Sequence, residues 1–97
     1  MLVALSAFDL RIPHSGSLKE KRHVVKTLSA GLRQRFNVAV AEVDHQDLWQ
    51  RTTLGVSAVG AQGYHLRKVM HQEERYLQGQ PAVELIEHRM TLHAQDD

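Results

Sequence analysis

The sequence contains no cysteine, only two prolines and no long apolar run. Without cysteine the chain can form no disulfide and has no thiol nucleophile, so a zinc site would depend on His and carboxylates. No apolar stretch approaches the roughly 18 residues of a spanning helix. The start "MLVALSAFDLR" has neither a basic segment nor a small-residue cleavage site. We therefore expect no membrane span and no secretory signal, with a cytoplasmic protein as the default.

The size and composition are those of one ordinary globular domain. The 97 residues can bury a single two-layer core, and the apolar fraction of 42% and charged fraction of 24% fit that class. We expect one domain over residues 1–93 and a frayed acidic tail over residues 94–97.

The net charge of +1 is unevenly distributed along the chain. Residues 11–41 carry a local charge of +6, which leaves about −5 for the remainder. Such a zone can bind an anionic partner, although a solvated helix surface is its commoner meaning. The charged residues of this zone are Arg11, Lys19, Lys21, Arg22, Lys26, Arg33 and Arg35, against Glu20 alone.

The first half of the chain predicts a strand, a helix and a second strand. Residues 2–12 alternate loosely and end at a loop that begins with Pro13. The stretch "SLKE" fits a capping box, in which the Ser17 hydroxyl accepts from the Glu20 amide and the Glu20 carboxylate reaches back. A helix over 18–35 follows, with Leu18, Val25, Leu28 and Leu32 on its apolar side. "VAVAEV" at 38–43 predicts the second strand.

The second half predicts a strand, a helix and a last strand. Residues 48–59 alternate in polarity, which places Leu48 in the core and Trp49 on the opposite face. The second helix has an apolar side of Leu66, Val69, Met70 and Leu77. It ends at Gly79, which can take a left-handed cap conformation. Residues 82–92 form the last strand, and their mixed parity suggests a bulge.

The order β-α-β-β-α-β predicts an α+β ferredoxin-like sandwich. Right-handed crossovers and a short link between the second and third strands give an antiparallel sheet of order 4-1-3-2. Both helices lie on one face, and the other face is open. The loop at 14–17, the start of the first helix and the turn at 44–47 then meet at one edge of the sheet.

This edge is a candidate anion-binding site. Lys19, Arg22, Lys26 and Arg33 lie within about 60° of one another on the first helix, and we call them the basic stripe. A phosphate could sit over Ser15, Gly16 and Ser17 at the helix start, with His14 and His45 nearby.

Asp44, His45 and Asp47 form a polar turn with two further interpretations. The carboxylates could cap the turn or neutralise the basic stripe. They could also join His45 in a metal or acid-base site, but no "HxxxH" or "HExxH" spacing supports one. No nucleophile elbow, glycine-rich phosphate loop or small-molecule substrate site is recognisable. We expect no catalytic residue, no metal, no cofactor and no enzymatic activity.

Trp49 and Arg51 share a parity and are expected on the open face of the sheet. An exposed indole beside Arg could stack a nucleobase, fill a subunit interface or cover the sheet edge. "RTTLGVSA" has no aromatic residue after Trp49, unlike the RNA-recognition motif. The small residues Ala39, Ala41, Gly55 and Ser57 would allow a second sheet or helix to approach closely. A homodimer through the open face is therefore an alternative to a nucleic acid there.

The stretches "SLKEKR" at 17–22 and "RFNVAVAEVDHQDLWQRTTLG" at 35–55 resemble the YlxP-like family of short bacterial proteins. The resemblance implies a ferredoxin-like fold and no established activity. The family's genes often stand beside those for translation initiation and ribosome-binding factors, which is an association and no physical argument. It supplies no catalytic residue.

The leading hypothesis is a non-enzymatic protein that binds RNA or a ribosome-associated protein through the basic stripe and Ser17. The alternatives are a self-associating module built on the open face and Trp49, and a small enzyme or metal site at Asp44, His45 and Asp47.

Overall fold

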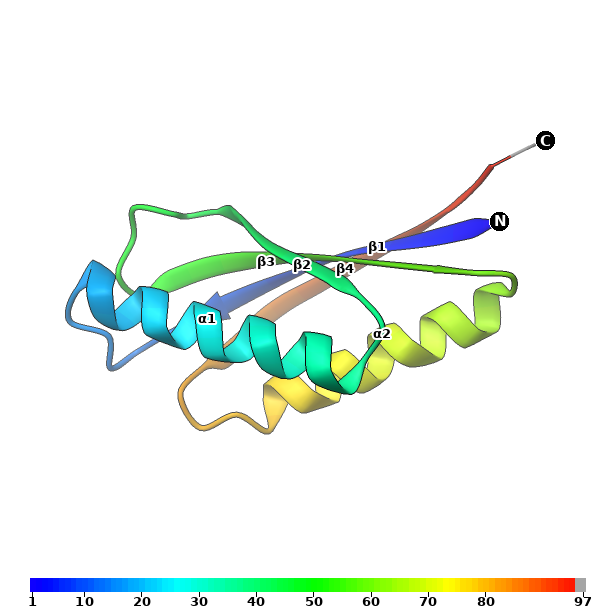
Figure 1. Cartoon of the computed structure of the whole chain (residues 1–97). Helices are drawn as coiled ribbons and strands as arrows, with labels where there is room; N and C mark the ends of the chain where they lie inside the picture. The colour runs from blue at the N-terminus through cyan, green and yellow to red at the C-terminus, as the bar shows by residue number, and fades with distance from the viewer. Residues whose placement is uncertain (96–97) are drawn as a thin grey trace.

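The computed structural model describes residues 1–95 as a four-stranded sheet and two helices (Figure 1). The elements are β1 (Leu2–Arg11), α1 (Leu18–Arg35), β2 (Ala39–Asp44), β3 (Arg51–Gly60), α2 (Gly63–Gln78) and β4 (Glu84–Ala94). The strands are antiparallel in the order β2-β3-β1-β4. This order is the predicted 4-1-3-2 read from the other side, so the ferredoxin-like arrangement is confirmed.

The core lies between the sheet and the helices, both of which cover the same face (Figure 1). On β1, Ala4, Phe8 and Leu10 are buried against the helices, because alternate strand residues point to one face. Their partners on β3 include Leu54, opposite Phe8. The intervening residues of β1 and β3 therefore face the open side of the sheet.

Helix α1 has the predicted bounds, whereas β3 begins three residues later than predicted. Leu48 is 48% exposed in the connection before β3 and does not enter the core. The prediction for Leu48 was wrong because its apolar alternation is equally compatible with an exposed turn. Hydrogen bonds to segments distant in the sequence, described below, hold residues 45–50 outside the strand.

The second half of the chain requires two smaller corrections. Gly79 ends α2 with φ of −83° and ψ of −5°, so the expected left-handed cap is absent and ordinary right-handed backbone closes the helix. Strand β4 continues to Ala94, and the Gln95 amide donates to the Met1 carbonyl at 3.0 Å. The pairing of the last strand therefore extends past residue 93, where the predicted domain ended. The last two residues of the chain, 96 and 97, lie outside the described residues.

The bulge predicted for the last strand is confirmed. Asp9 pairs with Glu87, while Leu10 pairs with Leu85, so one extra β4 residue lies between these pairs. That residue is Ile86, which is 50% exposed. The bulge explains the mixed parity, because residues before and after it contribute to the helix side with different spacing.

One carboxylate is buried in the core without a partner. Glu73 of α2 is 0% exposed, and neither of its carboxylate oxygens has a hydrogen-bond partner within the described chain. It continues the buried stripe of Leu66, Met70 and Leu77 at helical spacing. Burial disfavours the charged form and raises the pKa of Glu73 to about 7.

A histidine on β4 belongs to the same helix side of the sheet. The His88 ring stacks on Phe8 with 4.1 Å between centroids, and its Nε2 lies 2.9 Å from the Ser6 hydroxyl. Burial lowers the pKa of His88, and the nearby Glu74 carboxylate partly opposes this effect. Over residues 1–95, neither helix combines the length and apolar character needed to cross a bilayer.

Candidate functional site

The loop after β1 and the connection between β2 and β3 lie together at one edge of the sheet, as predicted. The Ile12 amide donates to the Gln50 carbonyl at 2.9 Å. The Gln50 side chain donates to the carbonyls of Pro13 and Ser15 at 3.3 and 3.2 Å. These bonds join two loops that are more than thirty residues apart in the sequence.

Lys21 ties this edge to α1. Its side chain is 1% exposed, and Nζ lies 2.6 Å from the Glu42 carboxylate. The same ammonium donates to the carbonyls of His45 and Gln46 at 2.6 and 3.1 Å. Glu42 also accepts a hydrogen bond from Thr52. Lys21 is therefore a buried connector and contributes no exposed charge to the basic zone of the sequence.

The polar residues at 44–47 lie at the end of β2 and in the turn that follows it. His45 has φ of 63°, the one positive φ among the non-glycine residues described, and its carbonyl accepts from the Leu48 amide at 3.1 Å. The Asp44 carboxylate accepts from the His45 amide at 2.7 Å and lies 3.9 Å from its ring nitrogen. Residues 45–48 therefore form a turn, and Asp44 is the last residue of β2.

Asp44 and Asp47 make no direct ion pair with the basic stripe within residues 1–95. Neither carboxylate forms an ion pair with Lys or Arg in residues 1–95. The connection binds Lys21 through the His45 and Gln46 carbonyls, and Glu42 of β2 pairs with the same ammonium. The same residues bring no three His, Asp or Glu side chains together in a geometry that could hold a metal. The absence of enzymatic activity stays a prediction.

The start of α1 is capped by its own side chains. The Ser17 hydroxyl accepts from the Glu20 amide at 3.1 Å, as the capping box predicts. The Glu20 carboxylate reaches the Gly16 amide at 2.7 Å, one residue earlier than in the usual box. A carboxylate thus occupies the place where the sequence suggested a phosphate, and an anion bound there would have to displace it.

The basic stripe remains exposed along α1. Lys19, Arg22, Lys26 and Arg33 are all exposed, and within residues 1–95 none of them forms an ion pair. Arg33 donates only to the Val40 carbonyl, at 3.4 Å. Any anion-binding role of this helix therefore depends on these side chains.

A shallow hollow runs beside the stripe, between α1 and α2. Its volume is about 470 Å³, and Lys26, His23 and Tyr76 contribute to its lining. Arg35, near the end of α1, lies over the Tyr76 ring at 4.8 Å from the centroid. The cationic surface of α1 therefore continues into a groove between the helices.

Trp49 lies at the loop edge and not on a strand. It was predicted on the third strand facing the open side, but β3 begins at Arg51. Trp49 is 53% exposed, beside the exposed Leu48. Arg51 starts β3 on the parity of Thr53 and Gly55, and its Nε is buried without a partner in the described chain. Trp49 therefore lies on the connection that hydrogen-bonds to the loop before α1 through the neighbouring Gln50.

Sequence reasoning missed the buried role of Lys21, although a signal was present. Leu18, Val25, Leu28 and Leu32 leave a gap in their stripe at position 21, three residues after the first and four before the second. A lysine at such a position either extends to solvent or finds a buried partner. Glu73 fills the equivalent gap between Met70 and Leu77 on α2.

Two comparisons with known proteins agree on the family of this chain. The model of the family described as "Protein of unknown function (DUF503)" matches residues 3–90. The chain is also 31% identical over 83 residues to "Uncharacterized protein YlxP" of Bacillus subtilis (strain 168), covering 86% of this chain and 90% of that protein. The chain therefore belongs to the DUF503 family and is similar to YlxP, as the resemblance of its sequence motifs indicated.

Proposed function

We propose that this protein binds RNA through the basic stripe of α1, without catalysing a reaction. The observation that carries the proposal is the exposure of Lys19, Arg22, Lys26 and Arg33 on one helix with no ion pair inside residues 1–95. Cations that are already paired gain little from a phosphate, whereas unpaired cations release bound counterions from the nucleic acid. The stripe therefore fits a phosphate backbone.

The exposed indole at the same edge supports a single-stranded RNA. Lys21, between stripe residues 19 and 22, holds the carbonyls of His45 and Gln46, which brings the connection that contains Trp49 against the start of α1. An exposed aromatic ring beside cations can stack an unpaired base and is sequence-tolerant. We propose that Trp49 stacks a base of the bound strand.

The binding test uses a labelled single-stranded RNA and fluorescence anisotropy. The test variant carries Lys19→Glu, Arg22→Glu and Lys26→Glu. We expect it to lose affinity on the order of 100-fold or more at low salt, because three phosphate contacts become repulsive. Wild-type binding should weaken with salt with a slope of about −2 to −3 on logarithmic axes, from about 0.7 per phosphate on a single strand.

The matched control reverses three exposed cations of α2, namely Arg67, Lys68 and Arg75. Both triple variants change the net charge equally, so a general effect of charge would weaken both. Binding that survives the α1 reversal, or that falls equally in the control, would refute the stripe as the site. Circular dichroism and thermal unfolding confirm that each variant is folded.

The identity of the RNA is a finer proposal with its own test. We propose that the RNA is ribosomal RNA; a protein bound to the ribosome is the alternative partner. The untagged protein should then sediment with ribosomal subunits from a bacterial lysate at low salt and separate from them at high salt. The α1 triple variant should stay in the supernatant at both salt concentrations, and sedimentation equal to that of the wild type would contradict the proposal.

A further inference from the structure

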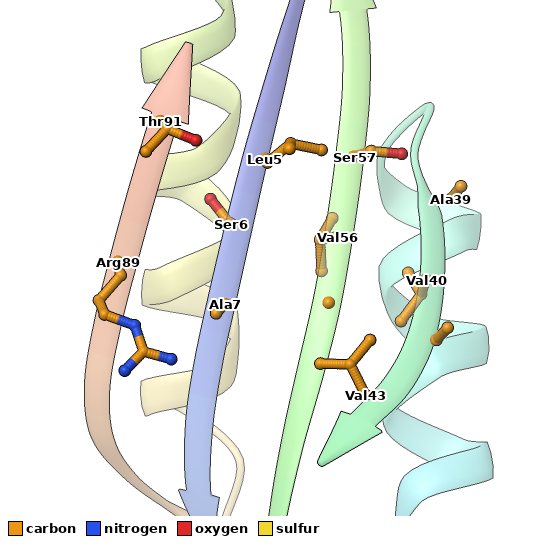
Figure 2. Close-up of a pocket in the computed structure, with 12 residues that line it drawn as sticks. Leu5, Ser6, Ala7, Ala39, Val40, Val43, Val56, Ser57, Arg89 and Thr91 are labelled. Atoms are coloured by element: carbon orange, nitrogen blue, oxygen red, sulfur yellow. The ribbon is translucent and has the colours of Figure 1, made fainter. Parts of the chain in front are cut away.

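The face of the sheet opposite the helices contains an apolar hollow. Its volume is about 510 Å³, and its lining includes Leu5, Ala7, Ala41, Val43 and Gly55 from β1, β2 and β3 (Figure 2). No residue of the described chain covers this hollow with a further layer, because both helices lie on the other face (Figure 1). The hollow is independent of the basic stripe, which lies on α1.

The surface combines protruding and recessed side chains. Leu5 and Val43 are 46% and 55% exposed, and they extend toward β3 from either side in Figure 2. Between them the floor consists of small residues. At Gly55 an added Cβ would lie only 2.8 Å from Val43 Cγ1, so Val43 leans over a position that has no side chain. A surface with both knobs and a recess can pack against a second copy of itself, as a two-fold interface requires.

The one Arg that borders the hollow is already paired with two carboxylates. Arg89 of β4 lies 3.7 Å from the Asp9 carboxylate and 3.5 Å from that of Glu87, and Thr53 donates to Asp9 at 2.5 Å. An Arg that already has two carboxylates offers little attraction to a phosphate of RNA or of a lipid. The border therefore favours an apolar protein surface over an anionic ligand.

The available area is sufficient for a specific dimer. Strands β1, β3 and β4 have 10, 10 and 11 residues and β2 has 6. At about 3.3 Å per residue and about 4.8 Å between strands, they present a face of roughly 600 Å². Two such faces would bury roughly 1,200 Å², the lower end of the range for specific interfaces. Two sheets packed in this way also bury exposed apolar side chains that a monomer leaves in water.

We infer that the open sheet face is a homodimer interface, in which the knobs Leu5 and Val43 of one copy enter the small-residue recess of the other. The two helical layers then lie on the outside of the dimer. Each copy keeps its basic stripe exposed, so self-association and RNA binding are compatible and separately testable.

The test is sedimentation velocity and equilibrium of the wild type and three variants over a range of protein concentrations. Ala41→Glu with Leu5→Lys introduces charges into the hollow at exposed positions. We expect the wild type to be a dimer and this variant to be a monomer, with its dimer dissociation constant raised at least 100-fold. Tyr64→Glu, at an exposed position of α2, is the matched control and should remain a dimer.

A third variant, Ile86→Glu, distinguishes the open face from the edge of β4. Ile86 is exposed at the bulge of that edge strand, where two sheets could instead pair side by side. Loss of the dimer in Ile86→Glu but not in the hollow variant would overturn the inference. A monomeric wild type at the highest concentration would also overturn it. Far-UV circular dichroism and thermal unfolding of every variant ensure that monomers are folded.

Discussion

Lys21 offers the sharpest test of how the loop edge is held to α1. In the variant Lys21→Met the apolar stem is preserved in length while the ammonium is removed. Glu42 then loses its partner at 2.6 Å, and the carbonyls of His45 and Gln46 lose theirs. We expect the free energy of unfolding to fall.

The magnitude follows from the burial of the pair. Removing one partner of a buried ion pair typically costs about 3–5 kcal/mol, because the other charge stays uncompensated. The Glu42 side chain is 19% exposed, so water relieves part of the cost and we expect roughly 3 kcal/mol. For a domain of this size, 1 kcal/mol shifts the melting temperature by about 4–8 °C. The expected decrease is therefore roughly 12–24 °C.

The assay is urea unfolding followed by circular dichroism, with thermal unfolding as a second measurement. The control is Lys19→Met, at an exposed position two residues away, which should change stability by less than about 0.5 kcal/mol. In the double variant Lys21→Met with Glu42→Gln, the second change should cost less than it does alone, because the unpaired carboxylate is removed.

The reasoning fails if Lys21→Met destabilises by less than about 1 kcal/mol, or no more than the Lys19 control. Additive effects of Lys21→Met and Glu42→Gln would also refute the ion pair as the source of the stability. RNA binding supplies an independent check. Both folded variants should bind RNA more weakly than the wild type for different reasons: Lys19→Met removes an exposed cation, whereas Lys21→Met releases the connection that carries Trp49. Only the Lys19→Met loss should therefore be accompanied by a shallower salt dependence.

Two further predictions concern α2 and its contact with α1. Because burial raises the pKa of Glu73 to about 7, the unfolded state releases its proton before the folded state does, and this term lowers stability as pH rises from about 4.5 to 7. Urea unfolding should therefore show that Glu73→Gln raises the free energy of unfolding more at about pH 8 than at about pH 4.5, by roughly 3 kcal/mol. A difference between variant and wild type that does not depend on pH would contradict this. Gly31→Ala should lower the melting temperature, at a cost of about 1–3 kcal/mol, although Ala is the better helix former, because its Cβ would overlap the Tyr76 hydroxyl. Tyr76→Phe should partly rescue that variant, and a stabilised Gly31→Ala would show that the helices adjust freely.

The Glu73 experiment uses the difference between variant and wild type because His88 acts in the opposite direction. The lowered pKa of His88 makes the folded state resist protonation, so this group removes stability as pH falls. The His88 contribution is present in both proteins and cancels in the difference. What remains is the titration of position 73.

The elements that could be predicted from the sequence are those defined by local signals. The bounds of α1 follow from the Ser17 capping box and from an apolar stripe with helical spacing, which depend on neighbouring residues only. The start of β3 could not be predicted in this way. Leu48 and Trp49 continue the alternation of the strand, and only the bonds of Gln50 to the loop after β1 assign them to a turn.

In the candidate site, too, the features set by local spacing could be predicted and those set by distant partners could not. The helical positions of Lys19, Arg22 and Lys26 follow from 100° per residue, and the structure leaves them exposed as expected. The burial of Lys21 does not follow from helical spacing, because its partner Glu42 lies on β2. The same is true of the phosphate expected over Ser17, whose place the Glu20 carboxylate occupies through the Gly16 amide.

The amino-acid sequence by itself determined the order of elements, the sheet topology and the face on which the helices pack. It could do so because apolar periodicity, caps and short connections act over a few residues, and the handedness of crossovers then leaves one arrangement. The tertiary structure decided which charges are buried, which are exposed and where an apolar hollow remains. Lys21 and Glu42 acquire their roles from partners distant in the chain, and only folding brings those partners within hydrogen-bonding distance.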